Sequence, residues 1–404
     1  MKPVVFVTAN ESKHGEVQRL LAGLDVRWAR LDLARPDTGD LEAIARARVV
    51  EAYRRLGEPC FLENTGLWLW SGDSPDTSSR STPRSHDGEP GASFKRVWRE
   101  LGEEGFAARY GGSRGIARVV VALAESAEPA DVQLFSGSIE GQLLSAPRGD
   151  GHFGWDRLWV PDGYDRTLGE MAGSAFVVNM RALPYLELGD HLRGRTSPGT
   201  FEAHVTVAAG GSSPDHEAFR AACTELGLKC ISIELPEGET RAQPMTGSFH
   251  RGELLDVQQE VIAIARELVR RGFEVTRTKI EAHGRLEWTP RTDEEALKGP
   301  STSYFEFHMK LALPANMDLA PVVARFKELG AHLSRNAHKA AGADGLAEHF
   351  VTVRAHRVGR LTAEARFAAF CVEVERAGYA VRNRIREYTV FDTNVALDRG
   401  WIDP

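Results

Sequence analysis

The sequence predicts an α/β N-terminal half followed by an α+β C-terminal half, and three observations support this prediction. Short β-branched runs alternate with helix-patterned segments up to residue 193. A glycine-rich loop with aromatic residues lies at 147–156. Beyond residue 200, the order βαββαβ occurs twice. Because 404 residues exceed one ordinary core, we expect three domains. Their boundaries are 1–193, 200–283 and 303–404.

The composition indicates an ordinary globular protein. Apolar residues make up 42% and charged residues 26%, and the formal net charge of −7 gives no reason to expect broad nucleic-acid binding. The cysteines lie in apolar runs without Cys-x-x-Cys spacing, which favours reduced core residues and a cytoplasmic location. We find no charged-then-apolar leader and no run of about eighteen apolar residues, so we expect no membrane partner.

The loop at 147–156 has the residue types of a nucleotide site. Its glycines let the backbone approach a ligand closely. Arg148 suits a phosphate, and the aromatic faces of Phe153 and Trp155 suit a nucleobase. The alternative interpretation is a glycine-rich loop around a buried aromatic side chain.

The first strand, within 2–8, leads into a polar turn and a helix. Asn10 and Lys13 lie in this turn, and the N-terminus of a helix attracts anions. The alternative is a capped helix with a solvated lysine. A second strand-to-turn segment, 59–67, carries Glu63 and Asn64.

Taken together, these segments resemble the inosine triphosphate pyrophosphatase family. The resemblance rests on Pro147-Arg-Gly149, Phe153-Gly-Trp-Asp156, Pro161-Asp-Gly-Tyr164, Thr167 and Glu170-Met171. It implies a mixed sheet with helices, and Mg²⁺-dependent hydrolysis of purine nucleoside triphosphates of the inosine and xanthosine class to monophosphate and pyrophosphate. The implied substrate-binding residues are Thr8, Asn10, Lys13, Phe153, Gly154, Trp155 and Asp156. The implied metal ligand is Glu63.

The sequence also departs from the family pattern. Asn64 occupies the position of the family's general base, and an amide cannot accept a proton at neutral pH. The family's lysine would fall at Gly173 and its His-Arg pair at Val178 and Asn179, so two cations that would offset polyphosphate charge are missing. An early acidic metal ligand of the family lacks a clear counterpart, and Asp37 or Asp40 could substitute for it. Two interpretations follow. Either metal or another carboxylate activates water, or the domain is a degenerate nucleotide-binding module.

The C-terminal half carries an internal duplication. Phe201-Glu-Ala-His204 opens one unit and Phe305-Glu-Phe-His308 opens the other. A later helix ends in Arg-Gly-Phe273 in the first unit and in Ala-Gly-Tyr379 in the second. The repeated βαββαβ order is the ferredoxin-like pattern, so we expect two such units packed as a pseudo-symmetric pair.

Histidines occupy equivalent places in the two repeats. His204 and His308 lie on first strands, where Thr206 and Lys310 share their faces. His204-Val-Thr-Val207 weakly resembles the His-x-Thr-x motif of two-histidine phosphoesterases, which implies a phosphodiester or RNA ligand. The other candidates in this half are His250, Arg251, His356 and Arg357. An inherited structural role, a phosphate or nucleotide site and a metal site remain open for the histidines.

Arginines accompany these histidines along the chain. If Arg251, Arg335, Arg354 and Arg357 shared one sheet face, the cleft would be basic and would suit RNA. Solvated strand ends are the alternative. A third interpretation is that this half mediates partner contact, including a homodimer.

Overall fold

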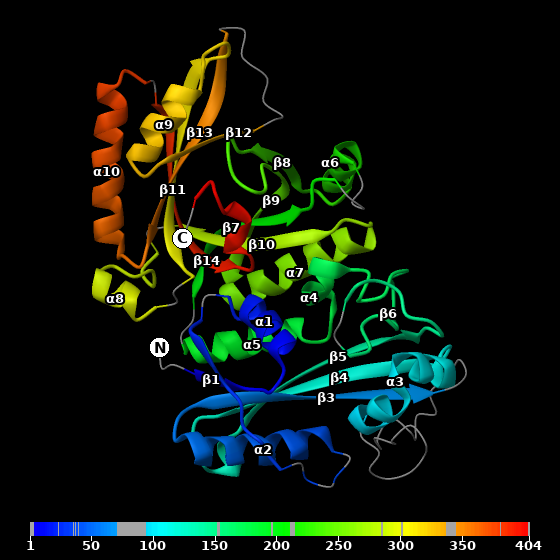
Figure 1. Cartoon of the computed structure of the whole chain (residues 1–404). Helices are drawn as coiled ribbons and strands as arrows, with labels where there is room; N and C mark the ends of the chain where they lie inside the picture. Colours follow the sequence, from blue (N-terminus) through cyan, green and yellow to red (C-terminus); the bar gives the residue numbers. More distant parts are fainter. Residues whose placement is uncertain are drawn as a thin grey trace. The chain divides into compact units, whose positions relative to one another are not determined.

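The computed structural model describes residues 4–402 except 23, 35, 37, 39, 71–93, 152–153, 195–196, 211–214, 284–285, 300–301, 337–344 and 380. Two residues named above, Asp37 and Phe153, lie outside the described residues. The chain forms two compact units, and the first ends at Gly194. Figure 1 shows the helices and strands of both units. Among the described helices, none combines the length and apolar composition that a bilayer crossing requires.

The N-terminal unit contains a six-stranded mixed sheet. Its order is β2-β1-β3-β4-β5-β6, in which β1 runs parallel to β2 and β3 while the later neighbours are antiparallel. The prediction of an α/β unit with a mixed sheet is therefore confirmed. The strands are β1 (Val4–Val7), β2 (Val26–Ala29), β3 (Cys60–Trp70), β4 (Arg114–Ala124), β5 (Gln133–Leu143) and β6 (Trp159–Pro161).

Helices cover both faces of this sheet. In Figure 1, α2 lies on one side of β3 and β4, and α1 and α5 lie on the other. The helices are α1 (Glu11–Leu20), α2 (Leu41–Leu56), α3 (Phe94–Tyr110), α4 (Ala175–Val178) and α5 (Ala182–Arg193).

Strand β3 presents alternate residues to the two helical layers. Leu62 belongs to the core shared with α2, whereas the ring of Phe61 meets Tyr185 of α5 at 6.2 Å. By the same alternation, Glu63 faces α5 and Asn64 faces α2. The implied metal ligand, Glu63, and the residue at the position of the family's general base, Asn64, therefore lie on opposite faces of one strand.

The C-terminal unit is a closed eight-stranded barrel. Its order is β10-β14-β11-β13-β12-β8-β9-β7, with β7 pairing back to β10, and all its pairs are antiparallel. The strands are β7 (Pro198–Val207), β8 (Lys229–Glu234), β9 (Ala242–Glu253), β10 (Val275–His283), β11 (Tyr304–Pro314), β12 (His332–Asn336), β13 (Leu346–His356) and β14 (Val381–Asp392).

Strands and helices follow the order βαββαβ twice along this unit. The helices of the first repeat are α6 (His216–Glu225) and α7 (Leu254–Arg270), and those of the second are α9 (Ala320–Glu328) and α10 (Arg360–Arg376). A short helix, α8 (Asp293–Leu297), lies between the repeats. The sequence did not predict that both sets of strands would close into one barrel, because strand pairing between repeats leaves no signal in the pattern of either repeat.

The barrel wall separates an apolar outer layer from a charged interior. On β11, the ring of Phe307 stacks on Phe367 of α10 with centroids 4.6 Å apart. Its neighbours Glu306 and His308 face inward, because side chains alternate along a barrel strand. The helices thus cover the apolar face and leave polar groups inside.

We predict that Phe307→Ala destabilises the barrel by about 3–5 kcal/mol, because it removes a ring that is only 1% exposed. Chemical denaturation followed by circular dichroism, fitted with one transition for each unit, measures this. The matched control is Phe249→Ala, whose ring is 71% exposed and whose loss is expected to cost much less. Equal effects of the two substitutions would contradict the packing described above.

Candidate functional site

A buried ion cluster centres on Glu63 in the N-terminal unit. Arg181, at the start of α5, donates from Nε and Nη2 to the carboxylate at 3.0 Å each. The hydroxyl of Tyr185 donates to Oε2 at 2.9 Å, and Lys13 Nζ lies 2.6 Å from Oε1. Both carboxylate oxygens are therefore engaged by residues of α1 and α5.

The cluster keeps Glu63 ionised. Burial alone would raise the pKa of its carboxyl, but the charges and hydrogen bonds of Arg181 and Lys13 hold that pKa well below its usual range. The side chain of Glu63 is 1% exposed and that of Arg181 3%, whereas that of Lys13 is 16% exposed. Lys13 is thus the member of the cluster closest to solvent.

A second acid, Glu16 of α1, extends the cluster. It accepts hydrogen bonds from Asn179 Nδ2 and, at 3.4 Å, from Arg181 Nη1. The departures at Gly173 and at Val178 and Asn179 predict two missing cations, but Arg181, two residues beyond Asn179, supplies a cation. The signal for it in the sequence is Asn179-Met-Arg181 before α5. Gly173 places no cation there.

The carboxyl group of Asp156 interacts electrostatically with Glu16 and Arg181 of this cluster. Burial, reinforced by the negative charge of Glu16, raises the pKa of its carboxyl to about 7, and Arg181 opposes this shift. A carboxyl group with a pKa near neutrality can exchange a proton at physiological pH. The backbone carbonyl of Asp156 accepts from Gly169 N at 2.8 Å, which ties the loop to the segment that follows it.

Asn64 lies away from this cluster, on the α2 face of β3. Its Oδ1 accepts a hydrogen bond from Arg48 Nη1 at 2.6 Å. Its buried Nδ2 finds no hydrogen-bond partner among the described residues. A carboxylate here would accept from Arg48 as well, so Arg48 is a partner that suits aspartate at least as well as asparagine.

The turn before α1 confirms one part of the simpler interpretation, the capped helix, and contradicts the other part, the solvated lysine. Asn10 is the N-cap, and its Oδ1 accepts from Lys13 N at 3.2 Å. Thr8 Oγ1 accepts from Asn10 N at 3.2 Å. The helix is capped as the simpler interpretation expected, but Lys13 is not a solvated lysine, since it joins Glu63.

The glycine-rich loop is held by the residues that follow it. Gly149 has φ of 86°, and an added Cβ would lie 2.4 Å from the backbone N of Glu170. Thr167 Oγ1 donates to the carbonyl of Arg148 at 2.9 Å, and Glu170 accepts from Thr167 N at 2.8 Å. Trp155 is buried, whereas Gly154 is exposed. Thr167 and Glu170 therefore have a structural role in shaping this loop.

Comparison with known proteins places this unit in a family. The model of the Ham1 family matches residues 4–175. A dITP/XTP pyrophosphatase from Ignicoccus hospitalis is 30% identical over 198 residues, which are 48% of this chain and 98% of the relative. The chain belongs to the Ham1 family. An inosine triphosphate pyrophosphatase from Yarrowia lipolytica is 31% identical over 42% of this chain and 84% of its own length.

A solved structure also matches the Ham1 unit. The HAM1 protein of Coxiella burnetii is 22% identical and covers 48% of this chain and 100% of its own, with a TM-score of 0.36. The Ignicoccus and Coxiella proteins each match about half of this chain.

Inside the barrel, His204 and His308 each meet an acid of their own repeat. His204 Nε2 lies 3.4 Å from Glu281, and its Nδ1 lies 2.9 Å from the carbonyl of Thr246. His308 Nε2 lies 3.4 Å from Glu387. Burial lowers the pKa of His308; for His204, the bond and charge of Glu281 outweigh burial and raise the pKa.

The other two histidines do not join them. His250 lies on the outer face of β9, where its Nδ1 is 2.6 Å from Glu260 of α7. His356 packs against the ring of Tyr304 at 4.7 Å. Thr206 is buried, and Lys310 Nζ lies 3.6 Å from Glu348. This arrangement gives no support to the resemblance to two-histidine phosphoesterases.

The four arginines do not share a face. Arg354 is inside the barrel and bonds Glu306 at 2.8 Å, whereas Arg251, Arg335 and Arg357 are exposed. The buried network includes three permanent cations, Arg277, Lys279 and Arg354, and six carboxylates, Glu202, Glu281, Glu306, Glu387, Asp392 and Asp398. An interior of this charge repels a phosphodiester, so RNA binding there finds no support.

We predict that Arg181→Met destabilises the Ham1 unit by about 3–5 kcal/mol, because it leaves the carboxylate of Glu63 buried without its main partner. Chemical denaturation measures the change. Arg27→Met is the control, since Arg27 pairs with Glu58 at the surface and such pairs contribute at most about 1 kcal/mol. A loss below about 1 kcal/mol for Arg181→Met would mean that Lys13 and Tyr185 suffice to hold Glu63.

Proposed function

We propose that the Ham1 unit binds a purine nucleoside triphosphate of the inosine or xanthosine class and hydrolyses it with release of pyrophosphate. The observation that carries this proposal is the buried cluster of Lys13, Glu63 and Arg181 in the electrostatic environment of Asp156. It occurs in a unit whose relatives are named for the same chemistry. Pocket roles for Thr8, Phe153, Gly154 and Trp155 are part of the proposal.

The triphosphate would be held through Lys13 and the N-terminus of α1. Lys13 is the more exposed of the two cations of the cluster and has a flexible stem, so a polyphosphate can draw it away from Glu63 at a lower cost than Arg181. Asn10 would continue to cap α1 and keep its first backbone N–H groups oriented toward the phosphates.

Mg²⁺ fits this site only together with substrate. Lys13 and Arg181 both engage Glu63 Oε1, so this oxygen would lose the ammonium of Lys13 and become accessible to an ion when Lys13 moves to the phosphate. Mg²⁺ is usually held by one or two carboxylates and by substrate phosphates, and it would offset the charge of the triphosphate. Glu63 is the residue that would hold it.

We assign the activation of water to Asp156. Asn64 cannot accept a proton, and Glu63 is too strongly held in its ionised form to be an effective base. Asp156 combines burial with a pKa near 7, which suits a base that works at neutral pH. It would therefore combine this role with shaping the pocket of the purine.

A second candidate function has one observation in its favour. Arg48 bonds Asn64 at 2.6 Å in a geometry that would suit a carboxylate, as expected if an aspartate had been lost there. The Ham1 unit would then bind the nucleotide without turning it over.

We also infer that each half of the barrel is a ferredoxin-like unit. Numbered within its own repeat, each half has the strand order fourth, first, third, second, namely β10-β7-β9-β8 and β14-β11-β13-β12. The two repeats then join through their fourth strands and through their second strands.

We predict that pyrophosphate release from ITP or XTP by the full chain rises with pH through about 7 and levels off above it, as Asp156 loses its proton. Asp156→Asn is expected to lower kcat on the order of 10²–10⁴-fold and to abolish this pH dependence. The matched control is Asp162→Asn, an exposed carboxylate that pairs with Arg114. If Asp156→Asn raises KM and leaves kcat unchanged, Asp156 only helps to bind the purine and does not activate water.

We predict that Asn64→Asp leaves turnover unchanged if Asp156 activates water, because Asn64 lies on the α2 face of β3 and Arg48 would hold the new carboxylate in its ionised form. The assay compares ITP, XTP, dITP, ATP and GTP with Mg²⁺. Turnover by the natural chain supports the hydrolase. Turnover only after Asn64→Asp supports the binding module, and inactivity of both proteins with nucleotide still bound would contradict the proposed hydrolysis.

A further inference from the structure

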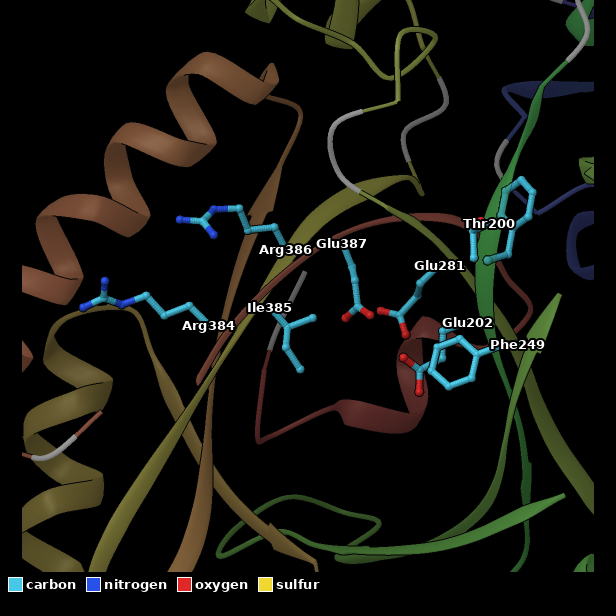
Figure 2. Close-up of a pocket in the computed structure, with 9 residues that line it drawn as sticks. Thr200, Glu202, Phe249, Glu281, Arg384, Ile385, Arg386 and Glu387 are labelled. Atoms are coloured by element: carbon cyan, nitrogen blue, oxygen red, sulfur yellow. The ribbon is translucent and has the colours of Figure 1, made fainter. Parts of the chain in front are cut away.

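Three side chains converge inside the barrel from three neighbouring strands. Glu281 of β10, Glu387 of β14 and His308 of β11 each place a donor atom within 4.8 Å of the others. Figure 2 shows the carboxylates of Glu281 and Glu387 pointing toward each other. Donors bound to one ion at about 2.0–2.3 Å lie about 3–4.5 Å apart, so small side-chain shifts would suffice. We propose that this cluster binds a divalent transition-metal ion.

The imidazole of His308 is oriented as a metal ligand requires. Its Nδ1 lies 3.1 Å from Thr352 Oγ1 on β13, and this contact fixes the ring. Its Nε2 turns toward Glu387 at 3.4 Å. Histidine ligands are commonly held in this way through the second ring nitrogen, which aims the first at the ion.

The charges around the cluster are incomplete. Lys279 Nζ lies 2.6 Å from Glu281 Oε1 and also pairs with Glu306, which Arg354 bonds as well. Among the described residues, no lysine or arginine pairs with Glu387. A buried carboxylate without a cation is costly, and a bound divalent ion would supply the missing positive charge.

A buried hydroxyl gives independent support. The side chain of Thr389 is 0% exposed, and its Oγ1 has no hydrogen-bond partner among the described residues. Strand register pairs Thr389 with Glu281 on one side and with Tyr304 on the other, which places it on the interior face. A water bound to the ion would satisfy this group.

The duplication explains why the cluster lies where it does. Glu281 follows Phe273 by eight residues and Glu387 follows Tyr379 by eight, so both repeats provide a glutamate from the last strand. By the same alignment, the position of Lys279 corresponds to Ile385. The first repeat therefore provides its own cation, whereas the second repeat leaves Glu387 and His308 available to an ion.

A cavity gives an ion access to these groups. It has a volume of about 360 Å³ and is lined by Thr200, Phe201, Glu202, Phe249, Glu281, Arg384, Ile385, Arg386 and Glu387. In Figure 2, Glu202 also faces the two carboxylates, while Arg384 and Arg386 point away from them. Two carboxylates and an imidazole suit ions such as Zn²⁺, Mn²⁺ or Co²⁺ better than Mg²⁺ or Ca²⁺.

The test titrates the full chain, stripped with a chelator, with Zn²⁺ by calorimetry and with Co²⁺ by visible absorption. We expect the natural chain to bind one more ion than Glu387→Gln, and His308→Asn to weaken that binding more than tenfold. The matched control is His250→Asn, whose histidine lies on the outer face of the same barrel, and it should bind as the natural chain does. Comparing variants of the barrel separates this ion from any that the Ham1 unit binds.

Thermal unfolding provides a second readout. Zn²⁺ should raise the Tm of the natural chain and of His250→Asn, and should raise that of Glu387→Gln much less. Equal stoichiometry in the natural chain and in folded Glu387→Gln would overturn the proposal. If Glu387→Gln does not fold, unchanged binding by His308→Asn would overturn it instead. Equal affinity for Mg²⁺ and Zn²⁺ would overturn the class of ion.

Discussion

The ion pair between Glu63 and Arg181 is the constraint on which the N-terminal site depends. It joins the central strand β3 to the start of α5. Each of the two buried charges offsets the cost of burying the other, so neither residue can be replaced alone without a large loss of stability. Once Arg181 fixes the carboxylate, Lys13 and Tyr185 can bond its two oxygens, and α1 is held beside α5. The turn before α1 and the start of α5 thereby become one site, although they are about 170 residues apart in the sequence.

The barrel also buries charged side chains, and most of them are paired. Closing eight strands leaves an interior that side chains must fill, and here they are charged. Arg277 and Arg354 both bond Asp398, and Arg277 also bonds Asp392, so each charge in that part of the barrel has a partner. Pairing is less complete around Glu387. Because the backbone of a closed barrel is rigid, a mismatch of charge there is met by an ion or a proton rather than by rearrangement.

The N-terminal half was largely predictable from sequence, because loop motifs and strand patterns depend on neighbouring residues. Arg181 was missed, since the segment around Asn179 departs from the family pattern and only the fold shows which residue reaches Glu63. The opposite orientations of Glu63 and Asn64 follow from strand alternation and were predictable. Only the structure shows which helix covers each of the two faces. Barrel closure was not predictable, because it depends on pairing between repeats. The position of His250 on the outer face, beside Glu260 of α7, was not predictable for the same reason.

The two buried clusters differ in which charge they leave available. Around Glu63 the more accessible of the two cations is Lys13, and an anion such as a triphosphate is the ligand that suits it. In the barrel Glu387 pairs with a histidine and with no lysine or arginine among the described residues, so the ligand that suits it is positively charged. A single ligand group cannot satisfy both requirements. The two units therefore offer different charges to a ligand: an accessible lysine in the Ham1 unit, and in the barrel a buried carboxylate without a lysine or arginine partner among the described residues.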